Sequence, residues 1–224
     1  MAYLKNTEFY DYFLENKEKL NDVSFLEKTI IEKIGYRVSK RQLNIAEEVT
    51  NEFGGHKLKQ YPNELAKYLC FLYSHASEIN SYFEIGVERG GTFFVVDSFL
   101  RALNPNFKHS FGIDIMDKIT CRGLELYSYK FGCQVTFKEI NSHDLEMTHN
   151  FDLTFIDADH SYHGALYDYS KFRPHTNKYV AFHDIKMDMW GVDKLWDDLS
   201  GNKWEFLNED ARFPVPVGIG LLGI

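Results

Sequence analysis

A buried strand that runs directly into a glycine-rich turn and then a helix is the feature that most constrains this chain. The strand and turn span residues 81–92, and an apolar run that predicts a helix covers residues 92–103. Glycines in the turn let the backbone take positive φ and approach a ligand without an intervening Cβ. The first helical turn would present unpaired N–H groups and the positive end of the helix dipole, so the stretch predicts a cofactor-binding turn. The apolar strand residues are Phe83, Ile85 and Val87, and the turn glycines are Gly86, Gly90 and Gly91.

The spacing of these glycines limits the kind of cofactor. The distance from Gly86 to the pair Gly90 and Gly91 is longer than in the G-x-G-x-x-G fingerprint, which argues against a nicotinamide dinucleotide. A glycine-rich turn after a strand is also ordinary α/β architecture. The turn alone therefore leaves a purely structural role open.

Strand and helix patterns alternate after the turn. This alternation predicts a mostly parallel sheet with helices on both faces, and such sheets bind ligands at the carboxyl ends of their strands. The predicted strands are residues 82–87, 110–115, 135–140, 151–156, 179–183, 204–207 and 218–222, and the predicted helices are residues 92–103, 122–131, 162–172 and 192–199.

The N-terminal part of the chain has helical patterns without strand alternation. Phe9, Phe13 and Leu14 are expected to share a helix face, and Ser24 with Glu27 and Ser39 with Gln42 have the spacing of capping boxes. We expect residues 1–58 to form a helical appendage and residues 59–224 the main domain, whose first helix begins at Pro62. The appendage is expected either to cover an edge of that domain or to act as a lid or a subunit contact.

Charge and cysteine content exclude several classes of protein. The formal net charge of −8 over 224 residues argues against a nucleic-acid partner, which needs clustered Lys and Arg. Cys70, Cys121 and Cys133 show no C-x-x-C spacing and are expected to be core residues in a reducing compartment. The N-terminus lacks a signal-peptide pattern, and no apolar run approaches the ~20 residues of a membrane helix. These features predict a cytoplasmic protein without a membrane partner.

Polar residues follow the predicted strands at their carboxyl ends. Asp114 closes the second strand, where a carboxylate can accept hydrogen bonds from both hydroxyls of a ribose. The turn at residues 141–144 could contact a base or simply cap a helix. Asp157, His183 and Asp184 follow two neighbouring strands and together have the chemistry of a divalent metal site, although helix capping and mutual hydrogen bonding are the alternative.

Five motifs carry a resemblance to a known family. They resemble the class I S-adenosylmethionine-dependent methyltransferases, and within that class the metal-dependent sugar and macrolide O-methyltransferases and the cephalosporin-hydroxylase-like branch. The resemblance covers residues 60–199, and residues 60–65 are similar to the segment that this branch places ahead of its first strand. The motifs are Glu84-x-Gly86-x-x-x-Gly90-Gly91-Thr92, Asp114, Ile156-Asp157-Ala158-Asp159-His160-Ser161-Tyr162, Phe182-His183-Asp184 and Gly191-Val192.

The resemblance implies an α/β, Rossmann-like, doubly wound seven-stranded sheet whose last strand is antiparallel. It implies that His160 and Asp157 are catalytic, with His160 as the general base, and that Asp157 and Asp184 hold the metal, to which the position of His183 at the same sheet edge adds a third predicted ligand. His183 departs from the acidic or amide residue that these enzymes often carry. The implied cofactor-binding residues are Glu84, Gly86, Gly90, Gly91, Thr92, Asp114, Ser142 and Asp157.

The predicted activity is methyl transfer from S-adenosylmethionine to a hydroxyl of a sugar or another small molecule, assisted by Mg²⁺ or Mn²⁺. A non-catalytic S-adenosylmethionine-binding module is the first alternative. A metal-dependent hydrolase is the second, but such sites usually gather more histidines than His160 and His183 supply. The sequence leaves the acceptor open among sugars, phenols and secondary metabolites, and the N-terminal helices are compatible with a homo-oligomer.

Overall fold

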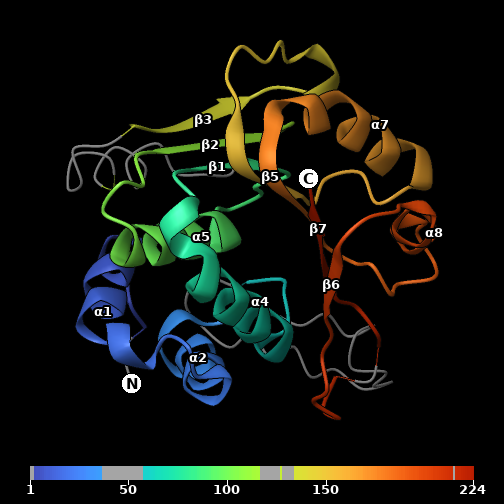
Figure 1. The fold of residues 1–224 in the computed structure, drawn as a ribbon. Helices are drawn as coiled ribbons and strands as arrows, with labels where there is room; N and C mark the ends of the chain where they lie inside the picture. The colour runs from blue at the N-terminus through green and yellow to red at the C-terminus, as the bar shows by residue number, and fades with distance from the viewer. Residues whose placement is uncertain (1–2, 37–57, 117–126, 128–133, 214) are drawn as a thin grey trace.

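Seven strands form one mixed sheet in the order β3-β2-β1-β4-β5-β7-β6 (Figure 1). The structure is a computed structural model that describes residues 3–36, 58–116, 127, 134–213 and 215–224. Strand β7 is antiparallel to both of its neighbours, so the predicted fold class is confirmed, including the reversed last strand. The strands are β1 (Ser81–Ile85), β2 (His109–Asp114), β3 (Gln134–Glu139), β4 (Phe151–Ile156), β5 (Thr176–Phe182), β6 (Lys203–Phe206) and β7 (Ile219–Gly223).

The parallel strands end in register at one edge of the sheet. Ile85 at the end of β1 pairs with Ile113 of β2 and with Ile156 of β4, and Ile156 pairs in turn with Phe182 of β5. The residues that follow these pairs must therefore lie side by side along the same edge. They are Gly86, Asp114, Asp157 and His183.

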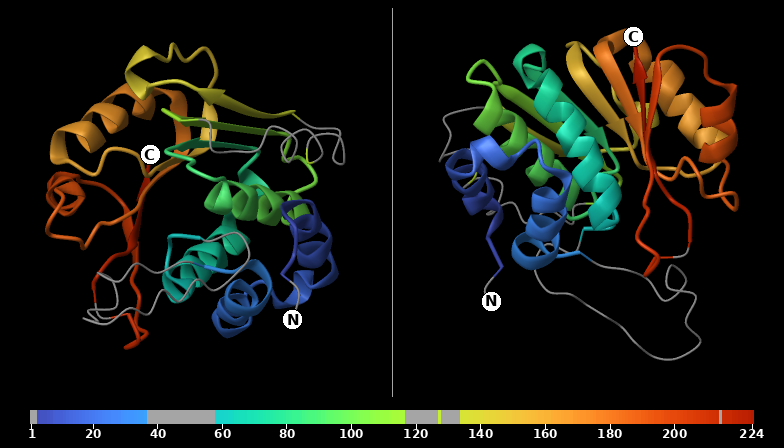
Figure 2. Two further views of the ribbon diagram at one scale, coloured as in Figure 1. Left: turned by 180° about the vertical axis from the view of Figure 1, so that it is seen from behind. Right: turned by 60° about the horizontal axis from the view of Figure 1, so that its bottom comes forward.

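Helices cover both faces of the sheet (Figures 1 and 2). Two hydrophobic clusters lie between the layers, one joining the sheet to α4 and α5 and the other joining it to α7 and α8. Helices α1 and α2 pack on α5 and α4, respectively, outside the first layer. The α-helices are α1 (Phe9–Glu15), α2 (Val23–Thr29), α4 (Pro62–His75), α5 (Gly91–Leu103), α7 (Tyr162–Phe172) and α8 (Val192–Asp198), and the shorter helical segments are Asn6–Glu8, Lys17–Lys19, Ile30–Ile34, Ala76–Glu78, Ser142–Asp144 and Arg173–His175.

The described part of the appendage, residues 3–36, shares its core with α4 and α5. Phe9 and Phe13 are buried as predicted, but Leu14 is 46% exposed. Residues four apart share a helix face, whereas a neighbour in sequence points away from it, so the prediction for Leu14 was wrong. The boundary at residue 58 stays a prediction.

The start of α2 also differs from the predicted capping box. Asp22 is the N-cap, and its carboxylate accepts hydrogen bonds from the backbone N–H groups of Ser24 and Phe25. Asp ranks with Ser as a cap, and here it comes two residues earlier, so Ser24 lies inside the helix. The second predicted box, at Ser39, and the predicted helix at 122–131, apart from Tyr127, lie outside the described residues.

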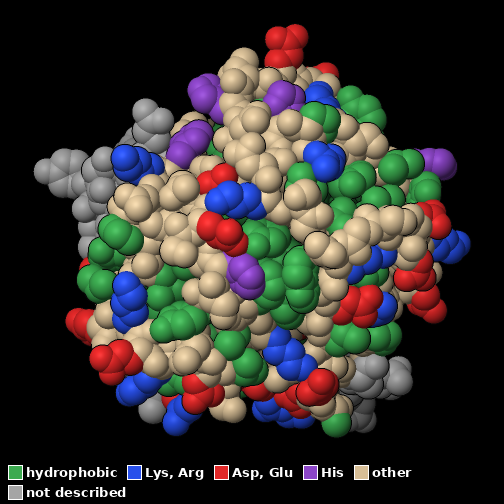
Figure 3. All heavy atoms as spheres, in the orientation of Figure 1, with side chains coloured by type: hydrophobic (Ala, Val, Ile, Leu, Met, Phe, Trp, Pro, Cys, Tyr) green, Lys and Arg blue, Asp and Glu red, His purple; other side chains and the backbone are tan. Residues whose placement is uncertain are grey.

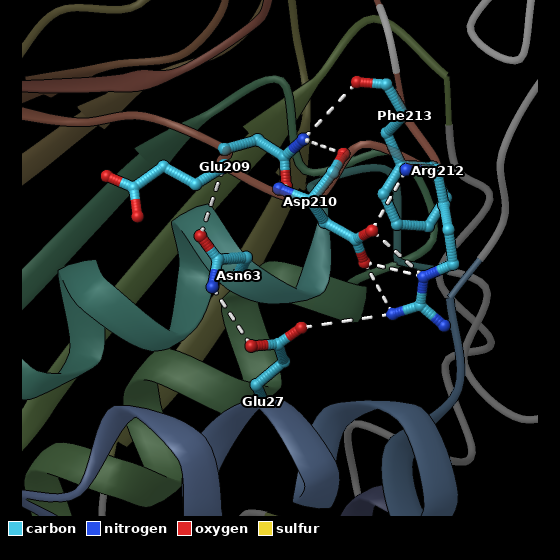
Figure 4. Close-up of polar contacts among 7 residues, drawn as sticks. Glu27, Asn63, Glu209, Asp210, Arg212 and Phe213 are labelled. Carbon is cyan, nitrogen blue, oxygen red and sulfur yellow. Dashed lines mark hydrogen bonds and ion pairs between the residues drawn. The ribbon is translucent and has the colours of Figure 1, made fainter.

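A polar cluster fastens the connection between β6 and β7 to α2 and α4 (Figure 4). Asn63 donates to Glu27 over 2.9 Å and accepts from the backbone N–H of Glu209 over 3.2 Å. Arg212 pairs with Asp210 and reaches Glu27 at 4.0 Å. These contacts hold a loop from the C-terminal part of the chain against two helices that precede the sheet.

Among the described residues, no helix is both long enough and apolar enough to cross a membrane. On the face of the molecule in Figure 3, acidic and basic side chains are interspersed with apolar ones. Basic side chains do not gather into a patch on that face.

Candidate functional site

A pocket of about 1070 Å³ opens at the carboxyl ends of the parallel strands. Its lining includes seven of the predicted site residues, which come from β2 and from the loops after β1, β3, β4 and β5. Four other predicted residues, Glu84, Gly90, Gly91 and Thr92, are not part of the lining. The seven are Gly86, Asp114, Ser142, Asp157, His160, His183 and Asp184.

The turn after β1 has the geometry that its glycines predicted. Gly86 has φ +89°, and a Cβ at this position would lie 2.0 Å from the carbonyl oxygen of Asp157. Gly90 has φ +82° and is the N-cap of α5, which begins at Gly91. Only glycine fits at position 86, because the β1 turn packs directly on the backbone that carries Asp157.

Asp114 holds the outer side of this turn. One of its carboxylate oxygens accepts from the backbone N–H of Glu88 over 2.7 Å, and the other accepts from the N–H of Met116 over 3.0 Å. Each oxygen has a second lone pair that can accept a further hydrogen bond from a ligand.

The polar turn after β3 is a single helical turn, Ser142–Asp144, capped by the Asn141 side chain, which accepts from the N–H of His143. Ser142 lines the pocket beside Asp168 of α7, which sequence reasoning had not included. Asp168 is buried, and burial raises the pKa of its carboxyl. The capping interpretation of this turn is confirmed, while contact with a base stays a prediction.

Glu84 does not line the pocket. It is buried in β1 and accepts a hydrogen bond from the hydroxyl of Tyr82. Burial raises the pKa of Glu84 well above its ordinary value. Within the protein, Glu84 is therefore a carboxyl group of the core.

Two carboxylates and two imidazoles meet at the pocket edge. His160 Nδ1 lies 3.2 Å from Asp184 Oδ2, and His183 Nδ1 lies 3.4 Å from both Asp157 Oδ1 and Asp184 Oδ2. Asp184 has φ +61°, an uncommon conformation for a residue other than glycine. Such backbone strain occurs often at functional sites, where surrounding contacts hold it.

The geometry favours a different histidine for a cation site from the one that the sequence predicted. Potential ligand atoms of Asp157, His160 and Asp184 all lie within 4.8 Å of one another. His183 instead turns into the core, where its Nε2 lies 3.1 Å from Glu64 Oε1.

The carboxylates and imidazoles of this cluster shift one another's pKa values. Burial lowers the pKa of His183, but the carboxylates of Asp184 and Asp157 outweigh burial and raise that pKa well above its ordinary value. Burial raises the pKa of Asp184, but His183 and His160 outweigh it and hold the Asp184 pKa below its usual range. The pKa of His160 is raised because Asp184 and Asp157 outweigh its burial.

His160 is accessible to the pocket. Its side chain is 35% exposed, and its ring stacks on Trp190 with 4.4 Å between the ring centroids. Since Nδ1 faces Asp184, Nε2 is the ring nitrogen that can exchange a proton with a ligand.

Gln60 and Glu64 are site residues that sequence reasoning missed. Gln60 donates to Asp157 Oδ2 over 2.9 Å and accepts from the hydroxyl of Thr92. Thr92 therefore acts on the site through Gln60. The sequence predicts the helix that begins at Pro62, but a buried glutamate at position 64 has no signal in hydrophobic periodicity.

Comparison with known proteins identifies the fold. No protein-family model and no curated protein matches the sequence. Among solved structures, the fold is that of the class I S-adenosylmethionine-dependent methyltransferases, which confirms the expected resemblance at the level of fold.

Three structures illustrate this similarity. TomG, an O-methyltransferase of tomaymycin synthesis from Streptomyces achromogenes, has a TM-score of 0.51 and 14% identity, with 91% of this chain and 96% of TomG covered. A putative O-methyltransferase from Klebsiella pneumoniae has a TM-score of 0.50 and 14% identity, with 95% and 88% covered. Magnesium protoporphyrin IX methyltransferase from Synechocystis has a TM-score of 0.50 and 10% identity, with 99% of each chain covered.

Proposed function

We propose that this protein transfers a methyl group from S-adenosylmethionine to a hydroxyl of a small molecule. The carrying observation is that the Gly86 turn packs on the backbone of Asp157, in a pocket that also contains His160 and Asp184. A cofactor turn and a group of acid–base side chains thus share one edge of a methyltransferase fold. The O-methyltransferases among the structural neighbours support this choice.

The residues around the turn fit the cofactor. Gly86 lets the β1 turn pack closely on the Asp157 backbone at the pocket, Asp114 keeps one accepting lone pair on each oxygen, and Ser142 also lines the pocket. We assign the amino-acid part of the cofactor to the turn with Gly86, Gly90 and Gly91, the ribose to Asp114 and the base to the side of Ser142. When bound, S-adenosylmethionine supplies an electrophilic methyl group on a sulfonium.

The chain's main contribution to such a reaction is positioning. Holding two reactants in line can lower a barrier by up to ~7–11 kcal/mol. His160 is suited to take the proton of the attacking hydroxyl, because Asp184 faces Nδ1 and leaves Nε2 for the acceptor. General bases usually contribute about 10²–10⁴-fold to the rate.

A divalent cation fits the same group of residues. Asp157, His160 and Asp184 offer two carboxylates and an imidazole, a donor set that suits Mn²⁺ or Fe²⁺ and admits Mg²⁺. A cation there would stabilise negative charge on the acceptor oxygen. If His160 Nδ1 is a ligand, His160→Ala should weaken Mn²⁺ binding, whereas a pure general base would lose turnover with unchanged Mn²⁺ affinity.

The pocket lining favours a neutral or cationic acceptor. Among the described lining residues, six carry carboxylates and Lys59 is the one basic side chain apart from histidines. This balance and the net charge of −8 disfavour nucleic acids and phosphorylated small molecules. We also propose that the protein is cytoplasmic and forms a homo-oligomer.

Calorimetric titration with S-adenosylmethionine, with and without Mn²⁺ or Mg²⁺, tests the proposal. The wild type should bind, and Gly90→Val should not. On a hydroxyl acceptor found by panel screening, His160→Ala should lose turnover with near wild-type cofactor affinity. His163→Ala is the matched control, since His163 does not line the pocket. Absence of S-adenosylmethionine binding under every metal condition would refute the proposed function.

A further inference from the structure

Glu64 is a fully buried carboxyl group directly behind the site. It is the third residue of α4, and its Oε1 accepts from the backbone N–H of Tyr61 over 2.8 Å, which completes a capping box. Capping does not require burial, because helix ends are commonly capped at the protein surface. Buried glutamates are rare unless they are paired, so the partner of Glu64 inside the core is the feature to explain.

That partner is His183. Glu64 Oε1 lies 3.1 Å from His183 Nε2, while Nδ1 on the other side of the ring faces the oxygens of Asp157 and Asp184 at 3.4 Å each. One buried ring therefore separates a carboxyl group in the core from two carboxylates at the pocket edge. The backbone of His183 is also fixed, because its N–H donates to the carbonyl of Ile156 over 3.2 Å.

The contacts continue to the residue proposed as the base. Asp184 Oδ2 faces both His183 and His160, and the other oxygen of Asp157 accepts from Gln60. Gln60 and Glu64 lie four residues apart, so one short segment supports both aspartates. A side chain that is held on both sides keeps one orientation, whereas a carboxylate with one partner can rotate.

We propose that Glu64 and His183 are a buried positioning pair that orients Asp157 and Asp184, and through Asp184 also His160. His183 is then a support for the aspartates, and not a ligand of a cation. What the aspartates do in the reaction rests on the proposed function. Their orientation, in contrast, is a property of the folded chain and can be measured without substrate.

Glu64→Gln tests this role, because it keeps the size of the side chain and replaces its carboxyl group by a neutral amide. In ¹⁵N-labelled full-length protein at one fixed pH, ring-nitrogen NMR signals should shift for His183 and also for His160, which Glu64 does not contact. Asp152→Asn is the matched control. Asp152 is another buried carboxyl group, at the amino end of β4, where it accepts from the N–H of Asn80 over 2.7 Å. Asp152→Asn should leave both ring signals unchanged.

Enzyme kinetics provide a second test of the positioning role. Glu64→Gln should lower kcat by about 10–100-fold, the usual effect of residues that orient functional side chains, with S-adenosylmethionine affinity within about twofold of wild type. If Glu64→Gln does not fold, His183→Gln should produce the same shift at His160. Unchanged His160 signals in a folded variant would overturn the proposal. A wild type that fails to bind S-adenosylmethionine would refute the methyltransferase function, but the NMR result would still decide the positioning role.

Discussion

Gly86→Ala should destabilise the protein more than alanine does at a glycine that has neither a positive φ nor a close neighbour. An L-residue at the Gly86 φ of +89° costs about 1–2 kcal/mol. The added Cβ would also lie 2.0 Å from the carbonyl oxygen of Asp157 and 2.5 Å from its carbonyl carbon, and overpacking usually costs about 1–3 kcal/mol. Together these terms predict a loss of about 2–5 kcal/mol in the free energy of unfolding, out of a usual total of about 5–15 kcal/mol.

Gly86→Ala should also weaken S-adenosylmethionine binding, because the backbone atoms that must move belong to Asp157, a residue of the site. The N–H of Asp157 donates to the carbonyl of Ile85 over 2.9 Å, and its carboxylate accepts from Gln60 over 2.9 Å. Relief of the clash moves this backbone away from Gly86 and turns the carboxylate. S-adenosylmethionine affinity should therefore fall even at temperatures where the variant is folded.

Thermal unfolding and calorimetric titration measure the two effects. In a chain of this size, 1 kcal/mol corresponds to about 2–4 °C in Tm, so Gly86→Ala should lower Tm by about 4–20 °C. Gly201→Ala is the control: Gly201 also has positive φ, at +134°, but its Cβ would meet the flexible Leu222 side chain at 3.1 Å. Gly201→Ala should lower Tm modestly and leave affinity unchanged. A Gly86→Ala protein with the Tm and cofactor affinity of the wild type would refute the reasoning.

Three further predictions concern other parts of the molecule. Asp97→Ala should lower the free energy of unfolding by about 3–5 kcal/mol in urea titrations, because it removes one member of the buried ion pair that Asp97 forms with Arg101 at 2.8 Å. Burial lowers the pKa of His109 below 6.5, helped by His149, so the unfolded chain binds the proton more readily and stability should fall as pH drops through about 6.5. His109→Gln should weaken this dependence of Tm on pH between 8 and 5, and an unchanged slope would exclude His109 as its source. Asp157→Asn should lower Mn²⁺ affinity by about tenfold or more, measured by electron paramagnetic resonance, and full activity after verified metal removal would argue against a catalytic cation.

Local pattern was sufficient to predict the sheet and the edge that carries the site. Apolar strands ending at Ile85, Asp114, Ile156 and Phe182 follow one another with helices between them, and parallel pairing then aligns their ends. The pattern did not predict the strand order, and the reversed last strand was expected only from the resemblance. The helix start at Asp22 shows the limit, since several residues in one short stretch can serve as a cap.

The residues that support the site could not be predicted in the same way. Gln60 contacts Asp157 across 97 positions, and Glu64 contacts His183 across 119. Such pairs depend on where α4 lies against the sheet, which no local spacing encodes. The sequence placed His183 in the cation set, which stays a prediction, and the structure adds that His183 also contacts Glu64 and that His160 lies close to both aspartates.

The backbone conformation of Asp184 bears on both the contact of His183 with Glu64 and the position of His160 beside the aspartates. β5 ends at Phe182, and Asp184 then takes φ +61°, so the chain turns sharply at the consecutive residues His183 and Asp184. A conformation of this kind costs about 1–3 kcal/mol, which folding tolerates only where other contacts fix the residue. His183 and His160 supply such contacts, both of them to Oδ2 of the carboxylate. At this turn His183 contacts Glu64 in the core, and Asp184 contacts both His183 and His160. The strain at Asp184 is therefore best explained by the arrangement of the site and not by the packing of the sheet.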